Sequence, residues 1–560
     1  MGMPASLTHA RRRDAPGDRR RLAAPGRVRY TGGMVHTSSV EIERKYDVPD
    51  GVPVPAFTGI EGIAEARPAE PVTLVAVYLD TADHALADRR MILRRREGGH
   101  DAGWHVKLPA DGGEGRTELG WPLADGDDGD GAIPPAVLDQ VAVHVRGREL
   151  TPLARLETVR TTVTLHDADG RAVAEFADDR VTGSDIRGGT VRAWHEWEVE
   201  LLPDAPAKRK QRAALLDRIE RHMVDAGARP SDSASKLARA LGADALGREA
   251  PAGPALPDPT TLTKESPASE VARAILARGV RDLVAADPHV RADEHDAVHR
   301  MRVAVRRLRS ALRTHQDVID PAATAPVRAE LTALGTVLGG ARDMEVLRDR
   351  VVWSVVEHDT ETVPDHVGDA LHDVLDERYR RARERVVRAL SSARYLALLD
   401  DLDRLVADPP LTHDASAPAG PALHAALRRD AERVGRRAAV AQEAVGEAAR
   451  TEALHEVRKA AKRLRYAAEE FSGRTVQVLG RKTMRLATAA EEVHDELGEH
   501  RDGIAMQRVL RDEAKRLAAR GEDAFALGVL HEAERLRTES ALWRAERALE
   551  RLLATAVPGA

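Results

Sequence analysis

The chain has 560 residues, enough for more than one domain with a sizeable core. Hydrophobic residues make up 42% and charged residues 31%, and no uncharged apolar run is long enough to cross a bilayer, which argues against membrane insertion. The absence of cysteine excludes disulfides and thiolate metal sites, and the formal net charge of -6 argues against a uniformly basic nucleic-acid coat, so any bound anion must meet a local basic patch.

The first 36 residues carry two arginine triplets among Ala, Gly and Pro, without an apolar period from which structure could form. We expect this basic segment to be disordered. Three interpretations stay open: an anion-binding arm, a targeting peptide, or translated upstream sequence with the true start at Met34. No apolar stretch follows the arginines, so a secretory signal is disfavoured.

From Val40 the pattern changes to a period of two, which is typical of β-strands. Glu41, Glu43 and Lys45 share one face of the first strand, and a late strand carries alternating glutamates in the same way. About eight strands are predicted; after the first, they cover 72–80, 91–97, 103–109, 114–122, 159–167, 171–180 and 190–202.

Carboxylates gather on the first and last of these strands, whereas basic residues gather on the strands between them. An ordinary sheet with a solvated face explains each strand alone, but not the separation of charge across all of them. A closed antiparallel barrel with a polar lumen explains it, with apolar side chains facing helices predicted at 134–146 and 207–226. Burying so many charges is costly unless each meets an opposite charge, so the lumen predicts a highly charged ligand.

The chemistry of this lumen suits one class of ligand. Carboxylates offer the hard oxygen atoms that Mg²⁺ and Mn²⁺ prefer, and arginine and lysine side chains bind phosphate oxygens. A metal-bound polyphosphate fits both. Phosphoryl transfer needs mainly positioning, charge neutralisation and an aligned nucleophile, which such a lumen would supply.

Several short blocks in this region resemble the CYTH domain, which has the triphosphate tunnel metalloenzyme fold. The resemblance covers roughly residues 37–241 and implies an eight-stranded tunnel that hydrolyses or cyclises triphosphates with divalent cations. The blocks are EIERK at 41–45, YLDT at 78–81, LRRR at 93–96, HVKLP at 105–109, Arg116 with Glu118, WHEWEVEL at 194–201 and SKLARAL at 235–241.

By position, the resemblance also implies roles for individual residues. Glu41, Glu43 and Lys45 would serve catalysis. The metal ligands would be Glu41, Glu43, Glu198, Glu200 and Asp179, with Asp178 as the alternative to Asp179. The phosphate-binding residues would be Lys45, Arg94, Arg96, Lys107, Arg116, Arg160 and Lys236, with Arg155 as the alternative to Arg160.

The remaining chain is predicted to be a linker and a helical domain. Residues 242–266 are rich in Pro, Gly and Ala, which is typical of a linker, and the acidic run at 125–131 lacks EF-hand spacing and is predicted to be a surface loop. From 267 to 556 the pattern is helical, with breaks near Pro288, Pro321, Pro364 and a loop at 409–421. The expected fold is α+β and multidomain: a tunnel of eight antiparallel strands with flanking helices, then an all-α bundle of two related halves.

Two halves are indicated by a basic stretch that occurs twice, HRMRVAVRRLR at 299–309 and HEVRKAAKRLR at 455–465. On a helix, the histidine and three of the following basic residues fall within about 80° of one another, beside an apolar stripe. Like charges at this spacing repel, so each stripe predicts a polyanionic partner. LGGARDMEV at 338–346 is echoed by LGEHRDGIA at 497–505, and Asp343 and Asp502 could each pair with an arginine to hold the stripe in place.

These repeats resemble the CHAD domain, a helical domain commonly found after CYTH. The resemblance implies that inorganic polyphosphate binds in a basic groove between the repeats. Each repeated histidine is alternatively a neutral surface side chain; beside a polyanion its pKa would rise and binding would strengthen below pH 7. By position, the binding residues would be His299, Arg302, Arg306, Arg307, Arg309, His455, Arg458, Lys462, Arg463 and Arg465.

The leading hypothesis is a Mg²⁺- or Mn²⁺-dependent hydrolase of inorganic triphosphate or short polyphosphate, with a polyphosphate-binding domain. Two alternatives stay open: a non-enzymatic polyphosphate binder at polyphosphate granules, and an adenylyl cyclase or thiamine triphosphatase. No aromatic cluster indicates a base pocket, sparse aromatics disfavour nucleic acid, and no Walker A motif is present. We expect a cytoplasmic protein, alone or at such granules, and the sequence leaves its oligomeric state open.

Overall fold

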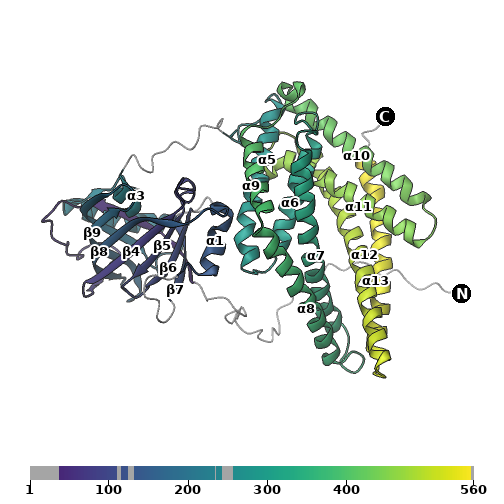
Figure 1. Cartoon of the computed structure of the whole chain (residues 1–560), viewed down its shortest axis with the longest axis horizontal. Helices are drawn as coiled ribbons and strands as arrows, with labels where there is room; N and C mark the ends of the chain where they lie inside the picture. Colours follow the sequence, from purple (N-terminus) through teal and green to yellow (C-terminus); the bar gives the residue numbers. More distant parts are fainter. Residues whose placement is uncertain (1–36, 110–114, 124–131, 234, 243–255, 557–560) are drawn as a thin grey trace.

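A computed structural model of the chain describes residues 37–109, 115–123, 132–233, 235–242 and 256–556 (Figure 1). The predictions for residues 1–36, for the acidic run at 125–131 and for most of the linker at 242–266 lie outside these residues. A sheet domain is followed by a helical domain, as predicted. None of the helices in the described ranges is long and apolar enough to cross a membrane.

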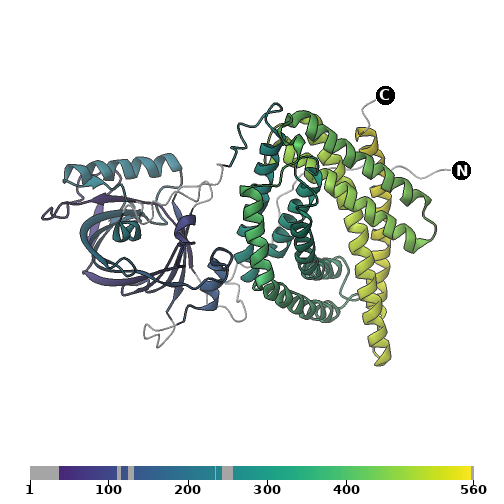
Figure 2. The same ribbon diagram turned by 45° about the horizontal axis from the view of Figure 1, so that its top comes forward.

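The N-terminal domain is built on one antiparallel sheet whose strands curve around a common interior (Figure 2). They pair in the order β1-β7-β6-β5-β4-β8-β9-β10-β2-β11, with β3 added to β8. Two short strands, β3 and β11, are not among those predicted. The bounds are β1 Thr37–Glu41, β2 Glu43–Asp47, β3 Glu65–Pro68, β4 Val72–Asp80, β5 Ile92–Glu97, β6 Gly103–Pro109, β7 Arg116–Pro122, β8 Thr151–His166, β9 Ala172–Asp185, β10 Thr190–Leu201 and β11 Arg229–Pro230.

The antiparallel sheet domain is confirmed, but the predicted closure of the barrel is wrong. In the described residues the sheet has 11 strands, and its path of pairings does not close. The first predicted strand divides at Ile42, because Glu41 pairs with Arg116 on β7 whereas Glu43 pairs with Glu200 on β10. Strands β1 and β2, which lie near opposite ends of the path, are therefore joined by the chain itself rather than by a strand ladder.

Helices cover the apolar outer face of the sheet at the two predicted places. Helix α1 (Pro135–Val145) packs on a cluster that contains Trp104 and Trp121, and α2 (Arg209–Asp225) packs on one that contains Phe176 and Trp197. Because side chains alternate along a strand, covering this face turns the charged positions toward the interior. A short helix, α3 (Lys236–Leu241), begins at Ser235, whose hydroxyl accepts a hydrogen bond from the Ala238 N–H.

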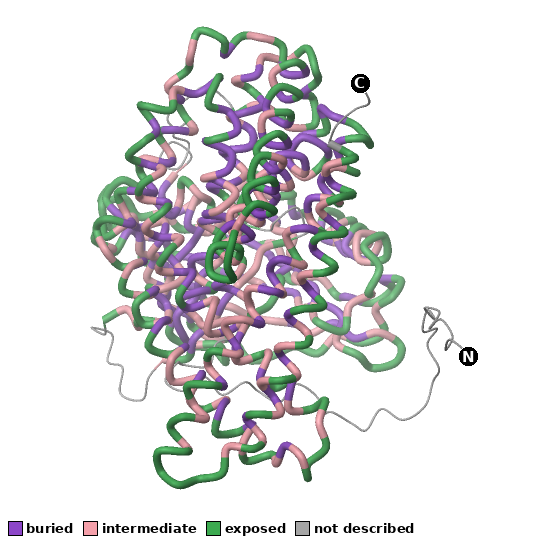
Figure 3. The backbone as a smooth tube through the Cα atoms, turned by 90° about the vertical axis from the view of Figure 1, so that its right-hand side faces the viewer, coloured by how far each residue is buried: buried purple, intermediate pink, exposed green. Residues whose placement is uncertain are grey.

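The described part of the C-terminal domain contains nine α-helices. The order of α5 to α8 is repeated by α10 to α13, so that basic helices α6 and α11 occupy equivalent places. Buried segments gather inside the bundle, while exposed segments lie on its outer turns (Figure 3). The bounds are α5 Ala268–Arg291, α6 Ala297–Thr314, α7 Ala325–Val356, α8 Asp365–Leu390, α9 Ala393–Ala407, α10 Ala419–Glu443, α11 Glu447–Glu469, α12 Arg481–Ala519 and α13 Phe525–Ala556.

Backbone hydrogen bonds at the start of each half reflect the internal repeat. Ala268 at the start of α5 donates its N–H to the Ala417 carbonyl at 2.9 Å, and Ala419 at the start of α10 donates to the Ser266 carbonyl at 2.8 Å. This reciprocal exchange is the contact expected of two related halves that face each other. One predicted break is wrong, because α5 continues through Pro288 for its last turn.

Candidate active site and cationic cluster

A cavity of about 550 Å³ lies inside the sheet domain. The alternating charged positions of the strands converge on it, which is the polar interior that the sequence predicts. Its lining includes the predicted residues Glu41, Glu43, Lys45, Arg94, Arg96, Lys107, Arg116, Arg160, Glu198, Glu200 and Lys236.

The structure decides two choices that the sequence leaves open. Asp179 faces inward beneath the cavity wall and accepts hydrogen bonds of 2.7 Å and 2.6 Å from Arg160, which itself lines the cavity. Asp178 faces the other way and accepts a 2.8 Å hydrogen bond from the Trp197 indole. Arg155 is exposed. Arg160 and Asp179 are therefore the members of each pair that belong to the interior.

Several basic side chains of the cavity are paired with carboxylates. The Lys45 ammonium contacts Glu198 and lies 3.0 Å from a Glu43 oxygen. Lys107 lies 2.6 Å from a Glu41 oxygen, and its Cα partner across the strands is Glu118. These contacts offset the cost of burying the charges and leave positive groups on the walls where a more highly charged anion could bind.

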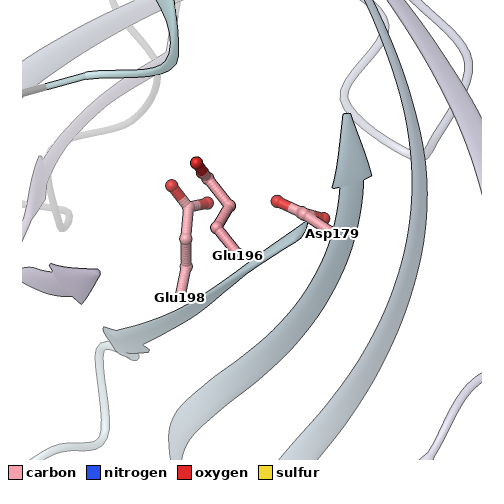
Figure 4. Close-up of side chains that lie close together, drawn as sticks. All are labelled: Asp179, Glu196 and Glu198. Carbon is pink, nitrogen blue, oxygen red and sulfur yellow. The ribbon is translucent and has the colours of Figure 1, made fainter. Parts of the chain in front are cut away.

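Asp179, Glu196 and Glu198 form a buried acidic cluster on neighbouring strands β9 and β10 (Figure 4). The Lys236 Nζ lies 3.0 Å, 2.7 Å and 2.5 Å from their respective carboxylate oxygens. Burial alone would raise the pKa of Asp179 and of Glu198, but Lys236 and Arg160 hold both values below the usual range. The spacing of these oxygens suits a metal ion, yet the cluster is already compensated by protein cations.

A second set of carboxylates, Glu41, Glu43 and Glu200, is less compensated. Burial raises the pKa of Glu41 to about 8, and its hydrogen bond with Glu118 adds to the shift. Burial followed by repulsion from Glu43 raises the pKa of Glu200 to about 7. Buried carboxylates that repel one another favour a divalent cation as the additional positive charge, and their hard oxygen atoms fit Mg²⁺ or Mn²⁺.

Glu118 is a lining residue that the predicted site omits. Its carboxylate lies 3.1 Å from Arg94, 3.6 Å from Lys107 and 2.7 Å from the His105 ring. Burial would raise the pKa of Glu118, but these neighbours and Glu41 hold it well below the usual range. The signal was present in the sequence, because Glu118 alternates with the predicted Arg116 along the same strand face.

In the helical domain, the contacting helices α6 and α11 bring together Arg302, Arg306, Arg458 and Lys462, here called the cationic cluster. Burial and then repulsion from nearby arginines lower the pKa of Arg458 to about 10. Burial and then repulsion from Arg458, Arg306 and Arg302 place the pKa of Lys462 well below its usual range. The cluster thus concentrates positive charge that the fold neutralises only in part, since Arg302 lies 3.9 Å from Asp343.

Other residues of the predicted stripes are engaged inside the protein. Arg307 donates to Glu470 at 2.8 Å and lies over the Tyr466 ring at 4.4 Å. Arg463 lies 2.7 Å from Asp430. Arg465 lies 2.7 Å from Glu469 and 2.5 Å from Glu491. Arg309 is half-buried, and burial followed by repulsion from Arg313 lowers its pKa.

Both repeated histidines have pKa values below the usual range in the absence of an anion. Burial followed by repulsion from Arg342 lowers the pKa of His299 to about 4. Burial followed by repulsion from Lys459 lowers the pKa of His455. Both rings are therefore neutral near pH 7, and their protonation beside a polyanion stays a prediction.

The repeated LGxxRD motifs meet each other. Arg501 of the second motif lies 3.0 Å from Asp343 of the first motif and 3.0 Å from its own neighbour Asp502. Asp343 and Asp502, which we expect to pair with an arginine, therefore both contact Arg501 of the second motif. This contact ties α7 to α12 beside the cationic cluster.

The sheet domain has an interior lined by opposite charges, and the helical domain has an internal repeat with a cationic cluster. Comparison with known protein families identifies both domains. Residues 39–225 match the CYTH domain and residues 274–511 match the CHAD domain. The chain belongs to the family of proteins in which a CYTH domain precedes a CHAD domain. CYTH domains are metal-dependent, and the CYTH domain family includes triphosphatases and cyclases.

A similar protein is Rv2226 of Mycobacterium tuberculosis, named as uncharacterized, which is 38% identical over 524 residues, 92% of this chain and 96% of that protein. The solved structure of PptA from Streptomyces chartreusis is 22% identical, with a TM-score of 0.42 over 51% of this chain and 100% of that chain. The CHAD domain from the plant Ricinus communis is 24% identical, with a TM-score of 0.39 over 54% of this chain and 97% of that chain.

Proposed function

We propose that the sheet domain hydrolyses inorganic triphosphate or short polyphosphate with Mg²⁺ or Mn²⁺. The observation that carries the proposal is the meeting of two charge sets in one cavity. The raised pKa values of Glu41 and Glu200 indicate too little positive charge around these two carboxylates, while arginines and lysines line the same cavity. A metal-bound phosphate chain supplies a cation for the carboxylates and a strongly charged anion for the basic residues.

In the proposed reaction, Glu41, Glu43 and Glu200 would hold the cation. The residues that bind phosphate oxygens are Lys45, Arg94, Arg96, Lys107, Arg116, Arg160 and Lys236. The bound cation would supply charge neutralisation and polarise the phosphoryl group. A water oxygen bonds to the terminal phosphorus, and the bond from that phosphorus to the bridging oxygen breaks, with its electron pair leaving on pyrophosphate. The water proton passes to solvent or to a cavity carboxylate. The chain's main contribution is to align the phosphates and exclude other orientations.

A substrate panel tests this proposal. With Mg²⁺ or Mn²⁺, we expect the full chain to release phosphate from inorganic triphosphate faster than from ATP, thiamine triphosphate or long polyphosphate. Formation of cyclic AMP from ATP as the main reaction would instead assign a cyclase. If the chain turned over none of these compounds, the proposed reaction would be overturned and the sheet domain would be a binding domain only.

A second consequence concerns pH and metal. The folded-state pKa values of Glu41 and Glu200 lie above the usual carboxylate value, so the folded chain binds more protons than the unfolded chain between about pH 4.5 and pH 8. Stability without metal should therefore fall as pH rises through this window. Because ligands must be deprotonated, we expect Mg²⁺ or Mn²⁺ to raise Tm more at about pH 8.5 than at about pH 6. Equal gains in thermal-shift measurements would contradict this site.

We further propose that the helical domain binds inorganic polyphosphate through the cationic cluster, which would keep the chain at long polyphosphate or its granules. The mutual repulsion of Arg458, Lys462 and their neighbours supports a polyanion as the missing partner. Tethering two phosphate-binding domains in one chain would raise the local concentration of substrate at the cavity.

A further inference from the structure

Helix α1 carries two apolar faces that serve different domains. Val137, Val141 and Val145, spaced one helical turn apart, pack in the same cluster as the sheet residues Trp104 and Trp121. Val143 lies on the opposite side of α1, is 0% exposed and belongs to the apolar cluster of the helical domain. The helix therefore lies between the sheet and α5, as both ribbon views show (Figures 1 and 2).

Ion pairs surround this shared apolar contact. Arg146, which follows α1 directly, lies 2.6 Å from Asp400 and 2.6 Å from Asp403 on α9, and its side chain is only 9% exposed. In the opposite direction, Arg291 of α5 lies 3.4 Å from Asp139 of α1. Each domain thus contributes a basic residue that pairs with an acidic residue of the other domain. The buried guanidinium of Arg146 would lose its partners if the domains separated.

The backbone at Arg146 also indicates a dedicated contact. Its φ of 53° lies in the left-handed region, where a helix C-terminus usually places glycine. A glycine follows immediately at 147, so the chain keeps an arginine at the position that favours glycine. Strain of this kind persists where the side chain has a role, and here the side chain carries the contact with α9.

The same contact reaches the rim of the cavity. Arg89, at the end of a short 3-10 helix (Ala87–Arg89), lies 3.9 Å from Asp403. The next residue, Arg90, has a left-handed φ of 57°, and its carbonyl accepts a 3.0 Å hydrogen bond from Arg116, which lines the cavity. The residue that contacts the helical domain and the residue that binds the cavity wall are therefore consecutive in the chain.

We propose that the helical domain docks on the sheet domain as a fixed part of one unit, with α1 shared between two cores and Arg146 bound between Asp400 and Asp403, and that this docking positions Arg116 at the cavity rim. The partner of this surface is the chain's own helical domain. The first part is independent of the proposed function, whereas the positioning of Arg116 rests on it.

Cross-linking tests the docking in the full chain, which has no native cysteine. We expect the double variant Arg146→Cys with Asp400→Cys to be joined in high yield by a short bis-maleimide reagent. The matched control is Arg155→Cys with Asp400→Cys, because Arg155 is exposed and pairs with Glu157 on its own strand. Equal yields for the two pairs would overturn the docking.

Binding tests the positioning of Arg116. We expect Asp400→Asn with Asp403→Asn to weaken the affinity of the full chain for inorganic triphosphate and Mg²⁺ about fivefold or more in calorimetric titration. The control Asp401→Asn, whose partner Arg404 lies on the same helix, should bind as the wild type does. Unchanged affinity in the double variant would overturn the positioning. No triphosphate binding by the wild type would overturn the proposed function and the positioning together, while the cross-linking result would still decide the docking.

Discussion

Replacing Glu41 and Glu43 together by glutamine should slow phosphate release from inorganic triphosphate by at least about 100-fold. Glutamine keeps the shape of the side chain but removes the charge that would hold Mg²⁺ or Mn²⁺. The loss should persist at saturating substrate, because the cation is needed in the reaction and not only in binding. Malachite-green measurement of phosphate release with either metal provides the rate.

The matched control is Glu157→Gln, which makes the same change at an exposed strand position. It should retain wild-type turnover. The double variant should also lose most of the gain in Tm that metal produces at alkaline pH, since two of the three carboxylates that would hold the cation are gone. Wild-type turnover by Glu41→Gln with Glu43→Gln would refute the assignment of the metal site.

The charged interior could be predicted from the sequence, because successive side chains of a strand point to opposite faces of the sheet, with a period of two residues. Glu41, Glu43, Lys45, Glu198 and Glu200 follow this rule and line the cavity. The division of the first strand at Ile42 could not be predicted, because it depends on the strand with which each half pairs in the folded domain. The same holds for Lys236, whose contact with three carboxylates is created by a helix far along the chain.

In the helical domain, the sequence indicates which helices are basic but not which charges remain uncompensated. Helical periodicity places Arg306 and Arg307 on one basic helix, yet Arg307 pairs with Glu469 and Glu470 from α11 and the turn after it. The acidic partners lie more than 160 residues away in the chain (|i−j| = 162 and 163), so local spacing carries no information about them. Tertiary packing therefore selects the cationic cluster from a longer list of candidates.

Lys462→Met should lower polyphosphate affinity by at least about tenfold and at the same time stabilise the protein. The pKa of Lys462 lies below its unfolded value because of burial and then repulsion from Arg458, Arg306 and Arg302. The folded chain therefore binds fewer protons at this site than the unfolded chain, and the charged ammonium opposes folding below the unfolded pKa. Methionine keeps most of the apolar stem and removes the charge, so Tm should rise by about 2 °C or more.

Lys459→Met is the matched control, because Lys459 lies on the same helix, is 53% exposed and pairs with Glu456 one turn away. It should change neither polyphosphate affinity nor Tm appreciably, since exposed ion pairs contribute little. A lower Tm for Lys462→Met, or unchanged affinity in a titration with polyphosphate, would contradict the role of the cationic cluster. A higher Tm together with a lower polyphosphate affinity is expected only where a lysine serves an external partner. A lysine whose charge stabilises the fold would lower the Tm when replaced.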